Sequence, residues 1–348
     1  MIPLFKCELD YFHSSHLLQI YDGFEKLHKM GIIELSLKPC KGNSSIPILK
    51  VKVDNKYTVI YDTLDGLNWI KAPIEENLNY LKKSIKADFY FKRSYNSEVL
   101  KYAPENCKVF PLGLNVCFKA DGKYPMNLDE LYSNFKRSNY SITSYFQTYL
   151  FKSKDLECLP TPSKENKILF MTRLFDPNDV TLEHLREERE TLNKNRIRYI
   201  NACKKEFGNQ FTGGLQKNAF AVENYKSLII PDHLTNRKAF LNTVENTNIC
   251  VTTTGLHNSI GWKFGEFVSA SRAIVAETLK YDLPGGFESQ KNYLNFDNEE
   301  QFFTSVHSLL NNKDQITEMM NANYKYYNNY LRPDKLVYNT LLKIHETI

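Results

Sequence analysis

The chain has 348 residues and a mass of 40.6 kDa, and its 42% hydrophobic and 24% charged residues exclude a disordered or fibrous protein. Its 45 Lys and Arg against 40 Asp and Glu give a net charge of +5, far below that of a dedicated nucleic-acid-binding protein. We therefore expect no nucleic-acid partner, and the length predicts two domains.

The cysteines and the apolar runs indicate the cellular compartment. The seven cysteines are widely spaced and include no C-x-x-C pair, which argues against a disulfide framework or a structural zinc site and favours a reducing cytoplasm. Lys6, Glu8 and Asp10 interrupt any apolar region of a secretory signal, and no stretch approaches the roughly 20 apolar residues of a membrane-spanning helix. We expect a cytoplasmic protein, either free or in peripheral contact with the inner face of the membrane.

Predicted strands and helices alternate along both halves of the chain. In the first half, β-branched and aromatic runs predict strands at 4–9, 48–53, 57–61, 88–91 and 108–112, and helical spacing predicts helices at 16–30 and 77–85. In the second half, similar patterns predict strands at 167–171, 227–230, 248–252, 273–276 and 293–296, and helices at 182–207 and after 299. This alternation is typical of an α/β fold with parallel sheets covered on both faces.

A linker separates the two halves. Residues 152–167 contain two prolines, two serines and four lysines without periodicity, so we place the domain boundary near residue 160. The predicted parts of the chain are an N-terminal lobe at 1–155, a linker at 156–166, a C-terminal lobe at 167–325 and a terminal helical segment at 326–348.

Open parallel sheets bind ligands beyond the carboxyl ends of their strands. Arg173 follows the strand predicted at 167–171, where a guanidinium can grip a diphosphate; an ordinary solvated arginine is the alternative. The sequence contains no G-x-G-x-x-G, no G-x-x-x-x-G-K-[ST] and no G-x-S-x-G. These absences disfavour dinucleotide-binding, P-loop and α/β-hydrolase functions.

Residues 252–277 combine a strand end, a polar loop with two glycines and the start of a helix near Trp262. Lys263 and Glu266 share a face of this helix, so the lysine and the helix-terminal amides can hold a phosphate while Glu266 accepts the hydroxyls of a ribose. A solvated ion pair between Lys263 and Glu266 is the alternative. The predicted donor-binding residues are Arg173, Gly255, His257, Asn258, Gly261, Trp262, Lys263 and Glu266.

The string KFGEFVSASRAIV at Lys263–Val275 resembles the K-x-x-E-[YF]-x-A-x-G-[KR]-x-[IV]-V segment in the C-terminal lobe of GT-B glycosyltransferases, of the group 1 or family 4-like donor-binding type. Thr172–Leu174 is similar to the G-R-L segment of that superfamily. The resemblance covers roughly residues 165–330. It implies two Rossmann-like lobes with parallel sheets facing a central cleft, and a C-terminal helix that packs back on the N-terminal lobe.

The same resemblance implies roles for three residues. Glu266 would bind the ribose of a nucleotide-sugar donor, Lys263 would lie beside the phosphates or the sugar, and Arg173 would neutralise the diphosphate. Asn258 stands eight residues before Glu266, where many retaining members have a glutamate, while Thr172 and Ser271 replace glycines. Whether the transfer is retaining or inverting therefore stays open.

The N-terminal lobe offers candidate bases. Asp62 and Asp65 follow the strand at 57–61, and either carboxylate can serve as the general base of an inverting transfer, although Asp65 before Gly66 also fits an Asx-turn. His13, in the first strand-to-helix loop, is a further catalytic candidate because histidine titrates near neutrality.

Three residues of this lobe are predicted to bind the acceptor. His16 lies in the first strand-to-helix loop and can act as a base or bind an acceptor anion. Lys92 and Arg93 follow another strand and can hold a phosphate of a phosphorylated or lipid-linked acceptor; a solvated basic turn is the alternative.

These patterns predict a glycosyltransferase that moves a sugar from a nucleoside-diphosphate sugar to a hydroxyl of a glycan or glycolipid, in polysaccharide or cell-surface glycan biosynthesis. Asp232, His233 and His257 lack zinc-binding spacing, so we expect no metal and no cofactor besides the nucleotide sugar as co-substrate. The expected partners are the donor, a glycan or lipid-linked acceptor and, peripherally, a membrane or other glycan-assembly enzymes. The alternatives are a non-catalytic nucleotide-sugar or glycan-binding module and a nucleotide-sugar epimerase on the same two lobes.

Overall fold

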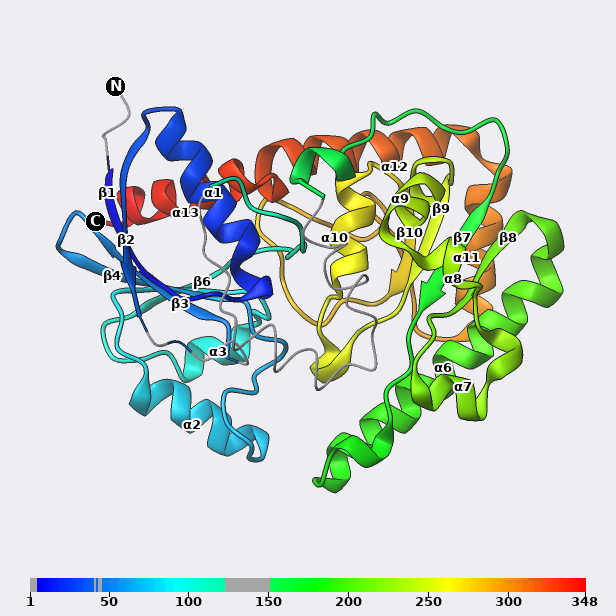
Figure 1. The fold of residues 1–348 in the computed structure, drawn as a ribbon, viewed down its shortest axis with the longest axis horizontal. Helices are drawn as coiled ribbons and strands as arrows, with labels where there is room; N and C mark the ends of the chain where they lie inside the picture. The colour runs from blue at the N-terminus through cyan, green and yellow to red at the C-terminus, as the bar shows by residue number, and fades with distance from the viewer. Residues whose placement is uncertain (1–4, 41, 43–45, 123–150) are drawn as a thin grey trace.

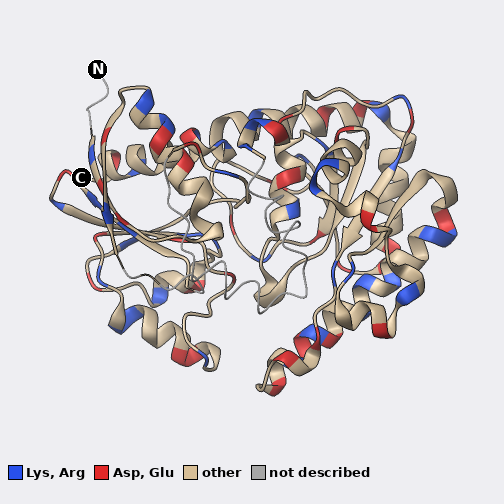
Figure 2. Cartoon of the chain, viewed as in Figure 1, with Lys and Arg blue, Asp and Glu red and all other residues tan. Residues whose placement is uncertain are grey.

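The computed structural model describes residues 5–40, 42, 46–122 and 151–348, which form two α/β lobes lying side by side (Figure 1). The predicted fold class is confirmed, because each lobe is built on its own sheet and carries helices around it. Lysines and arginines are interspersed with acidic residues over both lobes (Figure 2), as the modest net charge predicts.

The N-terminal lobe contains a six-stranded sheet in the order β2-β1-β3-β4-β5-β6. Its strands are β1 (Phe5–Tyr11), β2 (Ile33–Pro39), β3 (Ile48–Val53), β4 (Tyr57–Asp62), β5 (Phe89–Lys92) and β6 (Lys108–Pro111). The prediction of a parallel sheet is wrong for β3, which runs antiparallel to both β1 and β4. The turn between β3 and β4, in which Asp54 and Asn55 have positive φ, is too short for a parallel crossover.

The sequence patterns did not predict β2. It is an edge strand that pairs with β1 in parallel, and most of its side chains are exposed, so it lacks the alternation of a half-buried strand. The helices of this lobe are α1 (Leu18–Lys29), α2 (Ile74–Ser84) and the short α3 (Ser97–Lys101). Leu78 and Leu81 of α2 and Val99 of α3 pack with Tyr90 of β5 in one apolar cluster.

The C-terminal lobe contains a five-stranded parallel sheet in the order β11-β10-β9-β7-β8. Its strands are β7 (Ile168–Thr172), β8 (Phe211–Leu215), β9 (Ile249–Thr252), β10 (Ala273–Glu277) and β11 (Leu294–Phe296). All residues of β7 and β9 are buried, which explains their continuous apolar runs.

One strand prediction in this lobe is wrong, and one strand of the sheet was not predicted. The run at 227–230 forms a 3-10 turn at Lys226–Leu228, and only an isolated bridge links Ile229 to Leu215. The strand that the sequence patterns missed is β8, whose FTGGL sequence contains two glycines that weaken the β-strand signal.

The helices of the C-terminal lobe vary widely in length. They are α6 (Glu183–Phe207), α7 (Ala219–Asn224), α8 (Asp232–Thr235), α9 (Arg237–Glu245), α10 (Trp262–Ser269), α11 (Glu299–Asn311) and α12 (Lys313–Tyr326). Helix α6 is the longest of these, and its first turns project away from the lobe (Figure 1).

The last helix, α13 (Pro333–Thr347), packs back on the N-terminal lobe, which confirms that part of the predicted architecture. A Cβ added to Gly23 of α1 would lie 2.3 Å from the carbonyl oxygen of Pro333, so the two helices touch through the glycine. The Tyr61 hydroxyl of β4 also lies 2.7 Å from the Thr340 hydroxyl of α13.

The predicted linker lies against the C-terminal lobe. The buried Arg272 donates to the carbonyl oxygen of Leu159 at 2.7 Å, and the Ser271 hydroxyl donates to that of Cys158 at 2.8 Å. The stretch from Cys158 to Leu159 is therefore bound to the turn between α10 and β10. Among the helices that the structure describes, none is long and apolar enough to cross a bilayer.

Candidate functional site between the two lobes

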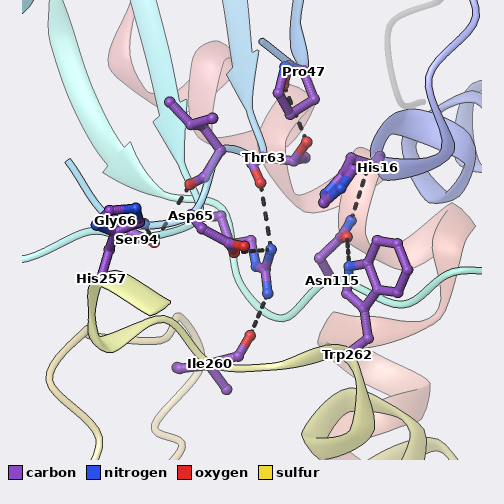
Figure 3. A network of polar contacts seen from close by, with 12 residues as sticks. His16, Pro47, Thr63, Asp65, Gly66, Ser94, Asn115, His257, Ile260 and Trp262 are labelled. Atoms are coloured by element: carbon purple, nitrogen blue, oxygen red, sulfur yellow. Dashed lines mark hydrogen bonds and ion pairs between the residues drawn. The ribbon is translucent and has the colours of Figure 1, made fainter. Parts of the chain in front are cut away.

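Arg93 joins the two lobes at the carboxyl end of β5. Its Nη1 donates to Asp65 Oδ1 at 2.8 Å within the N-terminal lobe, and its Nη2 donates to the carbonyl oxygen of Ile260 in the C-terminal lobe (Figure 3). The Arg93 side chain is buried, whereas Asp65 is partly exposed. The loops beyond the strands of both sheets therefore meet at this point, where the fold type places ligands.

Asn115, in the segment after β6, forms a second link between the lobes. Its Oδ1 accepts from Nε1 of Trp262, the first residue of α10, at 2.8 Å, and its Nδ2 donates to the carbonyl oxygen of His16 at 3.1 Å (Figure 3). The His16 ring packs on the indole of Trp262 with a centroid separation of 4.7 Å. The start of α10 is thereby fixed against the first strand-to-helix loop of the other lobe.

The His16 imidazole is uncharged at neutral pH. Burial, together with the nearby Arg93 and Arg173, lowers its pKa to about 4 against the opposing effect of Asp65. Its Nδ1 atom is buried and has no hydrogen-bond partner among the described residues. A neutral imidazole with an unpaired nitrogen can accept a hydrogen bond, and later a proton, from a bound hydroxyl.

His257 lies at the same meeting of the lobes, in a strained backbone conformation with φ of 59°. Its ring nitrogen Nε2 is 3.2 Å from Asn68 Nδ2, and its backbone N–H donates to Glu188 Oε1 at 2.5 Å. Gly66 has no side chain where a Cβ would meet the His257 Cβ at 2.2 Å (Figure 3). The structure thus places His257 against the N-terminal lobe, and burial lowers its pKa.

Three cations gather at the carboxyl edge of the C-terminal sheet. Arg173 follows β7, is exposed, and forms no ion pair with any carboxylate of the described residues; its guanidinium lies 4.9 Å from the centroid of the Phe175 ring. Arg196 of α6 donates to the carbonyl oxygen of Arg173 at 2.7 Å. Lys263 in the first turn of α10 completes the group.

The surroundings of Lys263 disfavour the charged form of its side chain. Burial, together with repulsion by Arg237, Arg173 and Arg196, lowers the pKa of its ammonium to about 8 against the opposing attraction of Glu266. Its Nζ lies 4.3 Å from the centroid of the Phe240 ring. This part of the site has more positive than negative charge and favours an anion.

Glu266 is paired with Arg237 and not with Lys263. Arg237, the first residue of α9, places Nη1 2.7 Å from Glu266 Oε1, and both side chains are largely buried. The structure shows no Lys263–Glu266 ion pair among its described residues. Glu266 also lines a cavity of about 260 Å³ between α9, α10 and residues 151–158.

Three further predicted donor residues form the loop before α10. Gly255 donates its N–H to the carbonyl oxygen of Ser259 at 2.7 Å and closes the loop. Asn258 is exposed, with φ of 55°. Gly261 is the N-cap of α10, and a Cβ added to it would meet nothing within 4 Å, so the first turn of α10 is open on this side.

The structure corrects the roles predicted for Asp62 and Lys92. Both side chains are fully buried, with Lys92 Nζ 3.2 Å from Asp62 Oδ1. Asp62 also accepts from Trp69 Nε1 at 2.8 Å, from the Tyr90 hydroxyl and from the N–H of Leu64 at 2.8 Å. A carboxylate with both oxygens bonded and no exposed surface is not placed to deprotonate an acceptor, and a buried lysine is not placed to bind one. The pair belongs to the buried packing of the N-terminal lobe instead.

The other predicted residues of the N-terminal lobe do not all lie in the same part of the structure. His16, Asp65 and Arg93 lie together at the meeting of the lobes. His13 is buried two residues beyond the end of β1. Among the described residues no group of three or more His, Cys, Asp and Glu side chains is arranged to hold a metal ion.

Sequence reasoning missed Arg196, Arg237 and Asn115. A signal existed for Arg196, because it shares a helix face with Ile200 and Cys203, both of which are buried, and a cation on such a face is unusual. Arg237 and Asn115 carried no comparable signal, since their partners are distant in the sequence.

Comparisons with known proteins find no matching family model and no matching curated protein. Similar solved structures include the C-terminal domain of the glycosyl transferase group 1 family protein LpcC from Francisella tularensis, at 11% identity and TM-score 0.35 over 52% of this chain and 98% of that chain. HepE of Anabaena in complex with UDP is similar at 10% identity and TM-score 0.42, over 81% and 71% of the two chains. The pneumococcal O-GlcNAc transferase GtfA in complex with UDP and GlcNAc is similar at 11% identity and TM-score 0.39, over 77% and 46%.

Proposed function

We propose that the protein is a glycosyltransferase that moves a sugar from a nucleoside-diphosphate sugar to a hydroxyl of a glycan or glycolipid. The observation that carries this proposal is the cluster of Arg173, Arg196 and Lys263 at the carboxyl edge of the C-terminal sheet. These three cations lie beside one carboxylate, that of Glu266. Glu266 is in the first turns of α10. A diphosphate joined to a ribose presents the complementary chemistry, two anionic groups next to a diol.

On the donor side, Arg173 and Lys263 hold the diphosphate together with the free N–H groups at the start of α10. Glu266 accepts from the ribose hydroxyls, and its ion pair with Arg237 orients the carboxylate. The leaving diphosphate gains negative charge as the bond to the sugar breaks. Cations placed beforehand at this position stabilise that charge more in the transition state than in the bound donor.

On the acceptor side, His16 is the proposed base. Its neutral imidazole and unpaired Nδ1 lie at the meeting of the lobes, beside Trp262. Asp65 is the second candidate, since its carboxylate is partly exposed, but it is already paired with Arg93. His13, buried beyond the end of β1, remains a third candidate. The acceptor hydroxyl would thus meet the donor sugar between His16 and the start of α10.

The proposed reaction uses protein cations, rather than a metal ion, to stabilise the leaving group. Arg173 and Lys263 supply two positive charges and Arg196 a third. Turnover should accordingly be unchanged by EDTA and should not rise with added Mg²⁺ or Mn²⁺. A strict dependence on either ion would contradict this part of the proposal.

The test is release of nucleoside diphosphate from UDP-, GDP- and dTDP-sugars, first without acceptor and then with glycan or glycolipid acceptors. Release of the diphosphate with one donor, stimulated by an acceptor, is the expected result. Binding without release from any donor would favour a nucleotide-sugar-binding module. Conversion of the sugar to an isomer without its transfer would favour an epimerase.

A further inference from the structure

Arg196 is a buried arginine without an acidic partner. Its side chain lies on α6, where the residue is only 5% exposed, and it forms no ion pair with any carboxylate of the described residues. Burial of an unpaired charge is costly, so buried arginines are normally matched by a carboxylate. Its unbalanced charge therefore calls for an explanation.

The guanidinium of Arg196 spans the ends of two neighbouring strands. Nε donates to Thr253 Oγ1 at 3.0 Å, and Nη2 donates to the carbonyl oxygen of Thr254 at 2.8 Å, both just past β9. Nη1 donates to the carbonyl oxygen of Arg173, just past β7, at 2.7 Å. All three acceptors are uncharged, and they place the cation at the sheet edge where ligands bind.

The surroundings of Arg196 add to its excess charge. Burial, together with the nearby Arg173, lowers its pKa to about 10 against the opposing effect of Glu277. Glu277, however, is committed elsewhere, since its Oε2 accepts from both the N–H and the hydroxyl of Thr254. The ring of Phe175 lies 5.1 Å from the Arg196 guanidinium and 4.9 Å from that of Arg173, which brings the two cations to one ring.

A guanidinium carries five N–H groups, and Arg196 commits three of them to the strand ends. We infer that Arg196 binds the diphosphate of the ligand directly, as a second arginine beside Arg173, with the N–H groups that the strand ends leave free. The inference rests on the proposed function for its ligand, and it assigns the role to a residue from the middle of a helix rather than from a strand-end loop.

The test uses inorganic pyrophosphate, which contains the diphosphate group without base or sugar. Calorimetric titration of the wild-type protein should show binding, and Arg196→Met should weaken it about tenfold or more because a charge-assisted hydrogen bond is lost. The matched control is Arg198→Met, on the same helix, where the half-exposed Arg198 is paired with Glu299 at 3.3 Å. This control should keep wild-type affinity.

A second variant separates direct binding from bracing of the loops. Arg196→Lys keeps the charge but not the three bonds, so direct binding predicts an affinity between those of wild type and Arg196→Met. A bracing role alone predicts equal losses for both variants, and that result would overturn the inference. Thermal unfolding shows which variants fold. If Arg196→Met does not fold, the test is the comparison of the affinities of Arg196→Lys and Arg198→Met.

The same titrations keep this inference apart from the proposed function. No pyrophosphate binding by wild type, or wild-type affinity in Arg196→Met, would overturn the role of Arg196. If pyrophosphate binding depends on Arg196 but UDP, GDP and dTDP bind no better than pyrophosphate, the anion site stands and the nucleotide-sugar function fails.

Discussion

Arg237 Nη1 lies 2.7 Å from Glu266 Oε1, so the carboxylate proposed to bind ribose already has a cationic partner from the next helix. The pair joins the first residue of α9 to the second turn of α10, and both side chains are largely buried. Arg237 bonds to one oxygen of the carboxylate, and we propose that the second oxygen accepts from a ribose diol. The pair therefore orients Glu266 for the donor and links α10 to α9.

Replacing Glu266 by Gln should weaken nucleoside-diphosphate binding about tenfold to a hundredfold, because hydrogen bonds to a charged group contribute about 1.5–3 kcal/mol. Calorimetric titration with UDP, GDP and dTDP measures the change. Glu245→Gln is the matched control, because Glu245 lines the same cavity but is exposed at the end of α9. Equal dissociation constants for wild type and Glu266→Gln would contradict the ribose-binding role.

The lowered pKa of Lys263 predicts a pH dependence of diphosphate binding. Lys263 is charged below its pKa of about 8 and loses its proton as the pH rises through that value. Affinity for a nucleoside diphosphate should be constant near neutral pH and fall above about pH 8, with the fall shifted upward by the bound anion. Lys263→Arg stays charged over this range, so its affinity should not fall. A flat wild-type curve would remove Lys263 from the phosphate site.

Asp62→Asn should destabilise the protein rather than act on catalysis alone. The change leaves Lys92 buried without its charged partner, and breaking a buried ion pair costs about 3–5 kcal/mol. Urea unfolding gives the free energy of unfolding. Glu34→Gln serves as the control: its pair with Lys6 is exposed on both sides and should cost about 1 kcal/mol or less. Normal stability with lost turnover in Asp62→Asn would restore Asp62 as a candidate base.

His16→Gln should slow transfer about a hundredfold or more, the usual contribution of a general base, while donor affinity stays at the wild-type value. Since the pKa of His16 is lowered to about 4, its imidazole remains neutral at pH 5 and above, and activity should not decline between pH 7 and 5 through this group. His13→Gln is the comparison and should have a smaller effect. An equal or larger loss in His13→Gln would move the base to His13.

Local sequence patterns predict the architecture well where burial is complete. The strands β7, β9 and β10 read as continuous apolar runs because both faces of the C-terminal sheet are covered. The pattern fails at β2, an exposed edge strand, and at β8, where Gly213 and Gly214 replace side chains. At 227–230, Leu228 and Ile230 are buried without forming a strand, because burial alone does not distinguish a strand from a turn.

The candidate site is predictable only where its residues are close in sequence. Lys263 and Glu266 are three positions apart, and helical geometry places both near the start of α10. The partner of Glu266 is instead Arg237, 29 positions away, and Arg196 reaches the loop after β9 from 57 positions away. The role of Asp62 is hidden from the sequence for the same reason. Its position at the end of β4 is typical of a catalytic residue, and only its contact with Lys92, 30 positions away, shows a buried ion pair.

The most direct test of the account is calorimetric titration of the wild-type protein with UDP, GDP and dTDP at neutral pH. The account predicts that one of them binds at one site per chain, more tightly than pyrophosphate, and that Lys263→Met and Glu266→Gln each weaken this binding. Absence of binding by all three, or binding that neither substitution changes, would contradict a nucleotide-sugar site at the start of α10.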